Sequence, residues 1–265
     1  MRRTIKKAIR LLSSPLRYIE QLYFQAMGSK FECITCRHKS NRFKSNSWHQ
    51  YSVCPNCTSN VRQRLLAASL KYLEAFRIDT IISDKRVLHF APEPPIRKLI
   101  KEKARDYKTA DFFAEGYAYD HIDYNLDISS MQTVPNESFD CVIACDVLEH
   151  VPDHIGGIRE VYRILSTGGY CIFTVPQKDF LKITFEDPTV TDPDERERIY
   201  GQRDHLRIYG DDFVDMMQAA GFDVTAVDEH YFDEKLRTRH VLAPPVLSKH
   251  PLATNYRKVF FGKKL

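Results

Sequence analysis

Two pairs of cysteines are the residues whose spacing most directly indicates chemistry. Cys33 and Cys36 are separated by two residues, seventeen residues follow, and Cys54 and Cys57 repeat the two-residue spacing. Each pair bends two sulfur atoms toward one point, and four thiolates fill the tetrahedral coordination sphere of Zn²⁺. The pattern therefore predicts a structural zinc site with no open position for catalysis. A redox role would need a thioredoxin-like βαβ setting, which this part of the sequence lacks.

A second chemically capable group lies in the polar segment 201–210. It combines an amide, an acid, a base, a guanidinium and a phenol within eight positions: Gln202, Asp204, His205, Arg207 and Tyr209. An imidazole titrates near pH 6.5, so His205 is a candidate catalytic base that Asp204 could orient. Arg207 could bind a carboxylate or phosphate of a substrate. Gln202 and Tyr209 complete the predicted substrate-binding set. His150 is the third catalytic candidate, with packing at a helix start as its structural alternative.

The stretch 139–176 predicts the elements that position these side chains. The apolar run 141–145 is too short for a helix and is followed by Asp146, which indicates a strand buried on both faces. Apolar residues then recur at helical spacing over 155–165, two glycines break the helix, and a second buried run spans 171–175. This is a βαβ unit, and open sheets of such units hold ligands at the carboxyl ends of their strands.

The same stretch resembles the fourth strand, the helix and the fifth strand of class I S-adenosylmethionine-dependent methyltransferases, and most closely the type 11 group. The text SFDCVIACDVLEH, the paired glycines and the terminal Pro176 carry the resemblance. It implies an α/β, Rossmann-like fold with a seven-stranded sheet and S-adenosylmethionine as cofactor. Segment 86–91 takes the place of the first strand, and segments 222–227 and 259–264 take the places of the last two.

The loop after the first strand departs from the family pattern. The family has glycines there, whereas this chain has His89, Ala91 and Glu93 among several prolines. Proline lacks the N–H groups that cradle an anion, but Glu93 could accept a hydrogen bond from the ammonium group of the cofactor. The resemblance assigns all three residues to cofactor binding. A non-catalytic relative with a degenerate pocket is the alternative.

The resemblance also assigns acids at the ends of the neighbouring strands. Asp111, at the end of the expected second strand, is the candidate for the ribose hydroxyls, and Asp127, at the exit of the third strand (121–128 with that exit), is the candidate for the adenine. Both acids have a role in turns as the alternative. Cys145 and Asp146 are expected beneath the sulfonium.

Length and charge indicate one α/β domain preceded by a smaller N-terminal part. The 265 residues carry a net charge of +4, yet residues 1–70 hold thirteen Lys or Arg against two Glu. We expect a basic amphipathic helical segment (1–28), a zinc-ribbon-like module (29–60) and the methyltransferase domain (61–265). The basic residues of 1–26 suit peripheral contact with an anionic membrane, and the alternative is a helix docked on the protein itself or fraying in solvent. No apolar run reaches eighteen residues, and the cysteine usage indicates the cytoplasm, at the inner face of the membrane if that contact forms.

The expected function is methylation of a hydroxyl on a sugar or another small metabolite, in the context of cell-envelope glycan synthesis. Basic and aromatic residues around the cysteines favour two alternatives, a small core for the module or a nucleic-acid surface. The second would make the chain an RNA methyltransferase, but the NPPY-like tetrad typical of base methylation is absent after residue 145.

Overall fold

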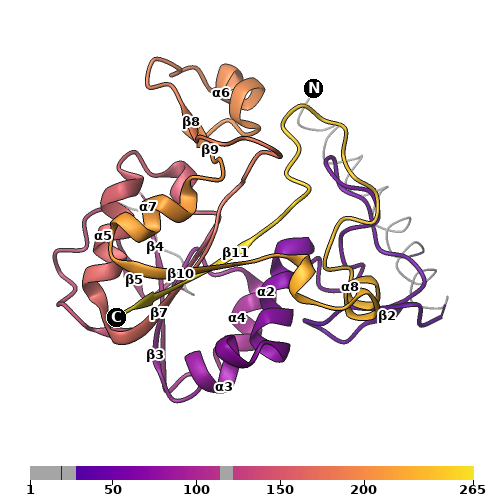
Figure 1. The fold of residues 1–265 in the computed structure, drawn as a ribbon, viewed down its shortest axis with the longest axis horizontal. Helices are drawn as coiled ribbons and strands as arrows, with labels where there is room; N and C mark the ends of the chain where they lie inside the picture. The colour runs from indigo at the N-terminus through magenta and orange to yellow at the C-terminus, as the bar shows by residue number, and fades with distance from the viewer. Residues whose placement is uncertain (1–18, 20–27, 114–121) are drawn as a thin grey trace, which may run out of the picture.

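A seven-stranded sheet runs through the computed structural model, which describes residues 19, 28–113 and 122–265 (Figure 1). The strand order is β10-β11-β7-β6-β3-β4-β5. The strands are β3 (Arg86–Phe90), β4 (Asp106–Asp111), β5 (Tyr124–Asn125), β6 (Phe139–Cys145), β7 (Leu165–Thr174), β10 (Phe222–Val227) and β11 (Val259–Lys264). β11 is antiparallel to both of its neighbours, whereas β3 to β7 pair in parallel. The predicted seven-stranded α/β fold is confirmed.

The central βαβ unit forms where the hydrophobic pattern predicted it. Alternate residues of β6 pack into two core clusters on opposite faces of the sheet, as expected for a strand buried on both faces. Helix α5 (His154–Ile164) follows, and the side chain of Asp153 caps it by accepting a hydrogen bond from the backbone of Gly156. The helix ends before the glycine pair, not at it, because Leu165 already pairs with Phe139 in the sheet.

Helices cover both faces of the sheet. α5 and α7 (Phe213–Ala219) pack on one face, and α2 (Val61–Tyr72), α3 (Ile78–Ile81) and α4 (Pro94–Ile100) pack on the other. Helix α2 begins with a reciprocal capping box between Asn60 and Gln63. Helix α2 ends at Tyr72 because Leu73 is extended, and the short 3₁₀ turn η1 (Glu74–Phe76) follows.

The N-terminal module is a hairpin of β1 (Phe31–Glu32) and β2 (Lys39–Ser40) followed by an irregular segment. It lies beside α8 (Glu234–His240) and the C-terminal segment 241–258, on the right of Figure 1. Glu32 pairs with Arg239 at 2.5 Å, and Gln50 forms a β-bridge with Val246. The module is therefore held by segments that are distant in sequence.

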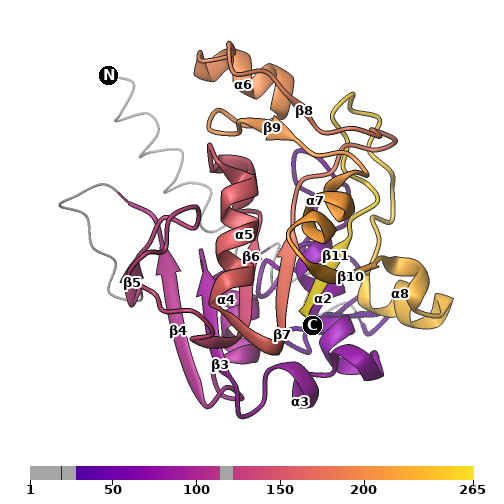
Figure 2. The same cartoon turned by 60° about the vertical axis from the view of Figure 1, so that its left-hand side comes forward.

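A projection stands over the carboxyl ends of the parallel strands (Figure 2). It comprises β8 (Phe185–Glu186), α6 (Pro193–Tyr200) and β9 (Arg207–Ile208). The side chain of Asp192 caps α6 by accepting a hydrogen bond from the backbone N–H of Glu195. Two 3₁₀ turns, η2 (Leu148–His150) and η3 (Glu229–Tyr231), complete the described elements.

Three expectations concern the limits of the described chain. No described helix has the length and apolar character needed to cross a membrane. The basic segment 1–26 lies outside the described residues except for residue 19, and so does part of the expected strand 121–128, of which only β5 forms.

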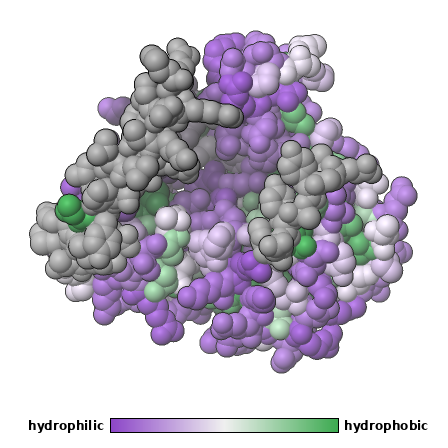
Figure 3. Space-filling model, turned by 180° about the vertical axis from the view of Figure 1, so that it is seen from behind, coloured by the Kyte–Doolittle hydropathy of each residue, from purple (hydrophilic) through white to green (hydrophobic). Residues whose placement is uncertain are grey.

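Seen from behind, the described surface is mainly hydrophilic and is hollowed near its middle (Figure 3).

Candidate functional site

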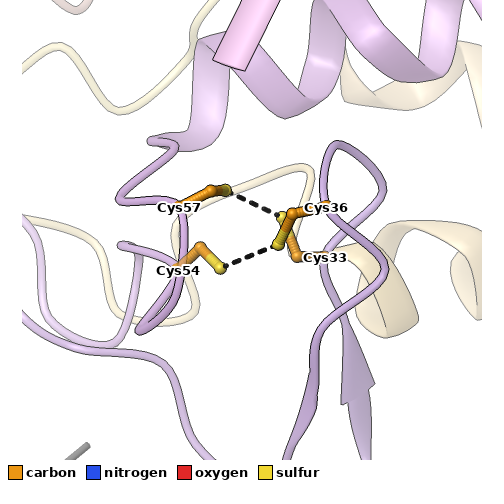
Figure 4. Close-up of side chains that lie close together, drawn as sticks. All are labelled: Cys33, Cys36, Cys54 and Cys57. Carbon is orange, nitrogen blue, oxygen red and sulfur yellow. Dashed lines mark hydrogen bonds between the residues drawn. The ribbon is translucent and has the colours of Figure 1, made fainter. Parts of the chain in front are cut away.

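The four cysteines of the module converge on one point (Figure 4). The Sγ atoms of Cys33 and Cys57 lie 3.6 Å apart, those of Cys36 and Cys54 lie 3.7 Å apart, and all four lie within 4.8 Å of one another. Zinc–sulfur bonds of about 2.3 Å in a tetrahedron place the sulfurs about 3.8 Å apart. The separations are too long for disulfide bonds and fit a zinc–thiolate centre.

The backbone around the cysteines repeats itself in the two pairs. Arg37 donates its N–H to the carbonyl of Cys33 at 2.7 Å, and Thr58 does the same to Cys54 at 3.1 Å. Arg37 and Thr58 stand where such knuckles often have glycine, and they adopt φ values of 61° and 60°. Both residues therefore take the left-handed conformation that glycine takes without strain.

Arg64 anchors the module to the rest of the chain. Its guanidinium is fully buried and donates hydrogen bonds to the carbonyls of Ser52 and Ser59 in the module and of His240 and Val241 at the end of α8. Burial lowers the pKa of Arg64 to about 10, and the cysteine thiolates nearby oppose that shift. A negative zinc–thiolate centre would thus offset a buried charge that has no carboxylate partner among the described residues.

Charged side chains meet between β3 and β6, where the chain connections diverge to opposite sides of the sheet. Arg62 forms a bidentate pair with Glu93 at 2.6 and 2.8 Å, and its Nε donates to Asp146 at 2.6 Å. Arg62 comes from α2, Glu93 follows β3, and Asp146 follows β6. Such a topological switch point is where open α/β sheets bind ligands.

Asp146 is the most constrained residue of this network. Thr174 donates to one carboxylate oxygen at 2.8 Å, and Arg257 donates to the other at 3.1 Å. Burial would raise the pKa of Asp146, but Arg62 and Arg257 outweigh it and lower that pKa to about 2. Asp146 has a φ of 51° and Ala91, after β3, has a φ of 43°. Strained conformations at the ends of both central strands are typical of a functional site.

The other cofactor candidates occupy different environments. His89 is fully buried, pairs with the hydroxyl of Tyr107 at 2.8 Å, and has its pKa lowered to about 3 by burial. Asp111 ends β4 and accepts a hydrogen bond from the backbone of Phe112, and Asp127 accepts two from Ser129 in a turn. Cys145 is buried at the end of β6, which raises its pKa to about 12. The structure therefore brings Glu93 and Asp146 together and encloses His89 in the core.

A cavity of about 170 Å³ opens beside this network. The N-terminal module, the start of α2, the end of β6, the projection and the C-terminal segment 241–258 all contribute to its wall. The wall includes Trp48, His49, Asp146, Glu149, Gln202 and His205. A site formed by segments so distant in sequence exists only in the folded chain.

Among the catalytic candidates, His205 lines this cavity, and His150 and Asp204 lie beside it. The rings of His150 and His205 meet edge to face, with centroids 4.8 Å apart, and the Nε2 atom of each lies 4.0 Å from Oε1 of Glu149. Asp204 lies 3.2 Å from Nδ1 of His150 and therefore pairs with that ring, not with His205 as expected. Burial, and after it the charge of His150, lowers the pKa of His205 to about 4. Burial, and after it the charge of Asp146, raises the pKa of Glu149 well above its usual value.

The three substrate-binding candidates lie in different environments. Gln202 is exposed and lines the cavity. Arg207 is fully buried, where it pairs with Glu186 and donates to three backbone carbonyls, and it thereby holds the projection to η2. Tyr209 is also buried and pairs with His154 at 3.0 Å. Only Gln202 among the three faces the cavity.

Sequence reasoning did not single out Arg62, Glu149 or Arg257 as site residues. Glu149 lies within the quoted Leu-Glu-His triplet, but nothing in the sequence shows that its side chain is only 1% exposed. Arg62 and Asp146 are 84 positions apart. The only local signal for Arg62 was its place at the start of the helix that follows the second cysteine pair.

The charges at the switch point fit S-adenosylmethionine. Glu93 and Asp146 can hold an ammonium group, Arg62 can hold a carboxylate, and Asp111 at the end of β4 has the place and chemistry for ribose hydroxyls. The four residues therefore offer partners for the amino-acid end and the ribose of this cofactor.

Comparison with known proteins identifies the family. The family described as methyltransferase domain matches residues 60–227. None of the curated proteins matches the chain significantly. A solved S-adenosylmethionine-dependent methyltransferase from Archaeoglobus fulgidus is similar at 15% identity, covering 77% of this chain and 94% of its own, with a TM-score of 0.48. One from Mesorhizobium loti is similar at 17% identity, covering 69% and 92%, with a TM-score of 0.46.

A third similar structure is 1,6-didemethyltoxoflavin-N1-methyltransferase from Burkholderia thailandensis, at 12% identity, 77% and 78% coverage and a TM-score of 0.48. The family match spans more than half of the chain and carries the assignment. The strand order, the switch-point charges and this match agree: the chain belongs to the methyltransferase-domain family and is an S-adenosylmethionine-dependent methyltransferase.

Proposed function

We propose that this enzyme methylates a hydroxyl group on a sugar or another small polar metabolite, and that the four cysteines hold a structural Zn²⁺. The cavity beside the switch point is the observation that supports this proposal. Its volume is close to that of an engineered protein cavity that binds benzene, so it accommodates one six-membered ring. A single polar ring with its hydroxyl directed at the end of β6 matches that space.

The cavity wall suits a polyhydroxyl ring. Trp48 offers an apolar face, and Gln202 and His49 offer hydrogen-bonding groups beside it. Pockets for small ligands combine apolar walls with a few placed polar groups in this way. Because Trp48 and His49 belong to the N-terminal module, the module would form part of the acceptor site, and zinc would act by keeping that wall in place.

His205, in the cavity wall, would supply the proton chemistry. When bound, S-adenosylmethionine provides an electrophilic methyl group on a positive sulfonium. His205 is neutral at pH 7 because its pKa is lowered to about 4, and a neutral imidazole has a nitrogen lone pair that can accept the hydroxyl proton. The ring of His150 contacts that of His205, and Asp204 pairs with His150.

The first test measures cofactor binding and methyl transfer separately. Calorimetric titration with S-adenosylmethionine and S-adenosylhomocysteine should give micromolar binding that Asp111→Ala weakens strongly. Incubation with S-adenosylmethionine and a panel of nucleotide sugars and small glycans should then yield a product heavier by one methylene. Cofactor binding without transfer to any hydroxyl acceptor in the panel would contradict the proposed acceptor class.

Structured RNA belongs in the same panel. Methylation of RNA, with binding that weakens steeply as salt is raised, would favour the nucleic-acid function instead. The basic residues around the cysteines, Arg37, Lys39, Arg42 and Lys44, are the ones whose neutralisation should then reduce the salt dependence.

A further inference from the structure

Glu149, His150 and His205 form a cluster whose spacing no hydrogen bond explains. The Nε2 atoms of both histidines point at the same oxygen, Oε1 of Glu149, and each lies 4.0 Å from it. A separation of 4.0 Å is too long for a hydrogen bond. First-row metals bind imidazole nitrogen and carboxylate oxygen at about 2.0–2.2 Å. At bond angles of about 90–110° this places two ligand atoms about 3–3.5 Å apart, so an ion would bind here once these side chains close by about 0.5–1 Å.

The polar atoms of this cluster are buried and lack partners among the described residues. Glu149 is 1% exposed and His205 is 3% exposed. Oε2 of Glu149 and both ring nitrogens of His205 have no hydrogen-bond partner. Buried polar groups without partners are rare in native structures, and an ion absent from the coordinates is one of their recognised explanations.

His150 has the hydrogen-bonding arrangement of a metal ligand. Its Nδ1 faces the carboxylate of Asp204 at 3.2 Å, and its Nε2 faces Glu149. Metal-ligating histidines usually donate their second ring N–H to a carboxylate, which fixes the ring and its tautomer. Asp204, expected from the sequence to orient His205, is placed to do this for His150.

We propose that Glu149, His150 and His205 bind a divalent first-row transition-metal ion at the wall of the acceptor cavity. Two imidazoles and one carboxylate form a ligand set that such ions use while keeping further positions open. The potential ligand atoms lie within 4.8 Å of one another, and two of the three residues line the cavity. This site is separate from the four cysteines, because the two share no ligand.

This inference rests on the proposed hydroxyl methylation and makes it more specific. An ion at this position would bind the acceptor hydroxyl through an open position and favour its deprotonated form. His205 would then serve as a ligand, and the hydroxyl proton would pass to solvent. The acceptor class would be a hydroxyl with a neighbouring oxygen that can complete the coordination.

Cobalt provides a direct probe that requires no acceptor. Protein whose cysteine site has been filled with one equivalent of Zn²⁺ is titrated with Co²⁺ by calorimetry and by visible absorption. We expect one further Co²⁺ per chain, with weak d–d bands and without the intense thiolate charge-transfer band. Glu149→Gln and His205→Asn should abolish this binding, and Asp204→Asn should weaken it about tenfold or more, as other outer-shell changes do.

The matched control is a surface cluster of the same residue types. Asp228, Glu229 and His230 also lie within reach of one ion, but His230 is largely exposed and already pairs with Asp228 at 3.4 Å. Asp228→Asn should leave Co²⁺ binding unchanged. Circular dichroism and thermal melting confirm that each variant is folded, and the isosteric Glu149→Gln keeps the test valid if His205→Asn unfolds.

The outcomes separate this inference from the proposed function. Failure of folded, zinc-loaded protein to bind Co²⁺, Mn²⁺ or Zn²⁺ at a second site would overturn the inference, as would binding that survives Glu149→Gln. If hydroxyl methylation persists in protein that contains only the cysteine-bound zinc, the proposed function stands and the second metal ion has no part in it. Metal binding without transfer to any hydroxyl would retain the site and reject the function.

Discussion

Replacing Arg64 with methionine should detach the N-terminal module from the sheet. The guanidinium is fully buried and donates to two carbonyls of the module and two at the end of α8. Methionine keeps most of the aliphatic volume and packs well in irregular spaces. The substitution therefore removes the donors while leaving little empty space.

The size of the effect follows from the carbonyls that lose their donor. Each buried acceptor left without a partner costs about 1–3 kcal/mol. The carbonyl of Ser59 keeps a second hydrogen bond, from the backbone of Cys54 at 3.0 Å, so it loses least. Removing the buried charge of Arg64 returns part of its desolvation cost. We expect a net loss of about 3–5 kcal/mol, a large share of the 5–15 kcal/mol typical of a folded protein.

Urea unfolding of the zinc-loaded protein measures this loss, and a chromogenic chelator records zinc release in the same samples. Arg196→Met is the matched control, because Arg196 is half-buried and its Nε donates to a single carbonyl, that of Val190. It should cost no more than about 1 kcal/mol. If Arg64→Met and Arg196→Met are equally stable, or if zinc is retained equally in both, the anchoring role of Arg64 is wrong.

Three further predictions test the module, the core and the cofactor site. Arg37→Gly should raise the free energy of unfolding by about 0.5–1 kcal/mol, because glycine takes the left-handed φ of 61° without strain. Burial lowers the pKa of His89 to about 3 and of His154 to about 4. Stability should therefore fall as the pH drops from 6.5 toward 4, by up to about 1.4 kcal/mol per pH unit for each histidine, and His154→Asn should make the fall shallower. Arg62→Met should weaken S-adenosylmethionine binding at least about tenfold in calorimetry, because it removes the guanidinium proposed to hold the cofactor carboxylate.

Each of these predictions has a control in the same chain. Lys39→Gly, in a strand of the module, should destabilise the protein where Arg37→Gly stabilises it, and equal losses would show that no strain is present. For the pH series, a stability that does not change between pH 7.5 and pH 5 would contradict the burial of neutral histidines. Arg86→Met removes a similar ion pair, with Asp140 at 2.7 Å, from the opposite end of β3. If it weakens cofactor binding as much as Arg62→Met does, the effect is not specific to the switch point.

Features set by local sequence were predictable. The alternation of buried residues in β6, the helical spacing of α5 and the paired cysteines each depend on neighbours in the chain. Side-chain period and ligand spacing carry that information directly. The seven-stranded sheet followed from the same patterns together with the family resemblance. The exact end of α5 did not follow, because pairing of Leu165 with Phe139 in the sheet decided it.

The site itself depended on tertiary structure. Arg62 reaches Asp146 across 84 positions, and Asp204 reaches His150 instead of the adjacent His205. The sequence determined which acids, bases and thiols are present and which strand ends they follow. Only packing decided that Glu149 is enclosed, that Arg207 is used to hold the projection, and that the module forms one wall of the cavity. Burial and pairing of polar side chains depend on distances between distant segments, and those distances exist only after the core has formed.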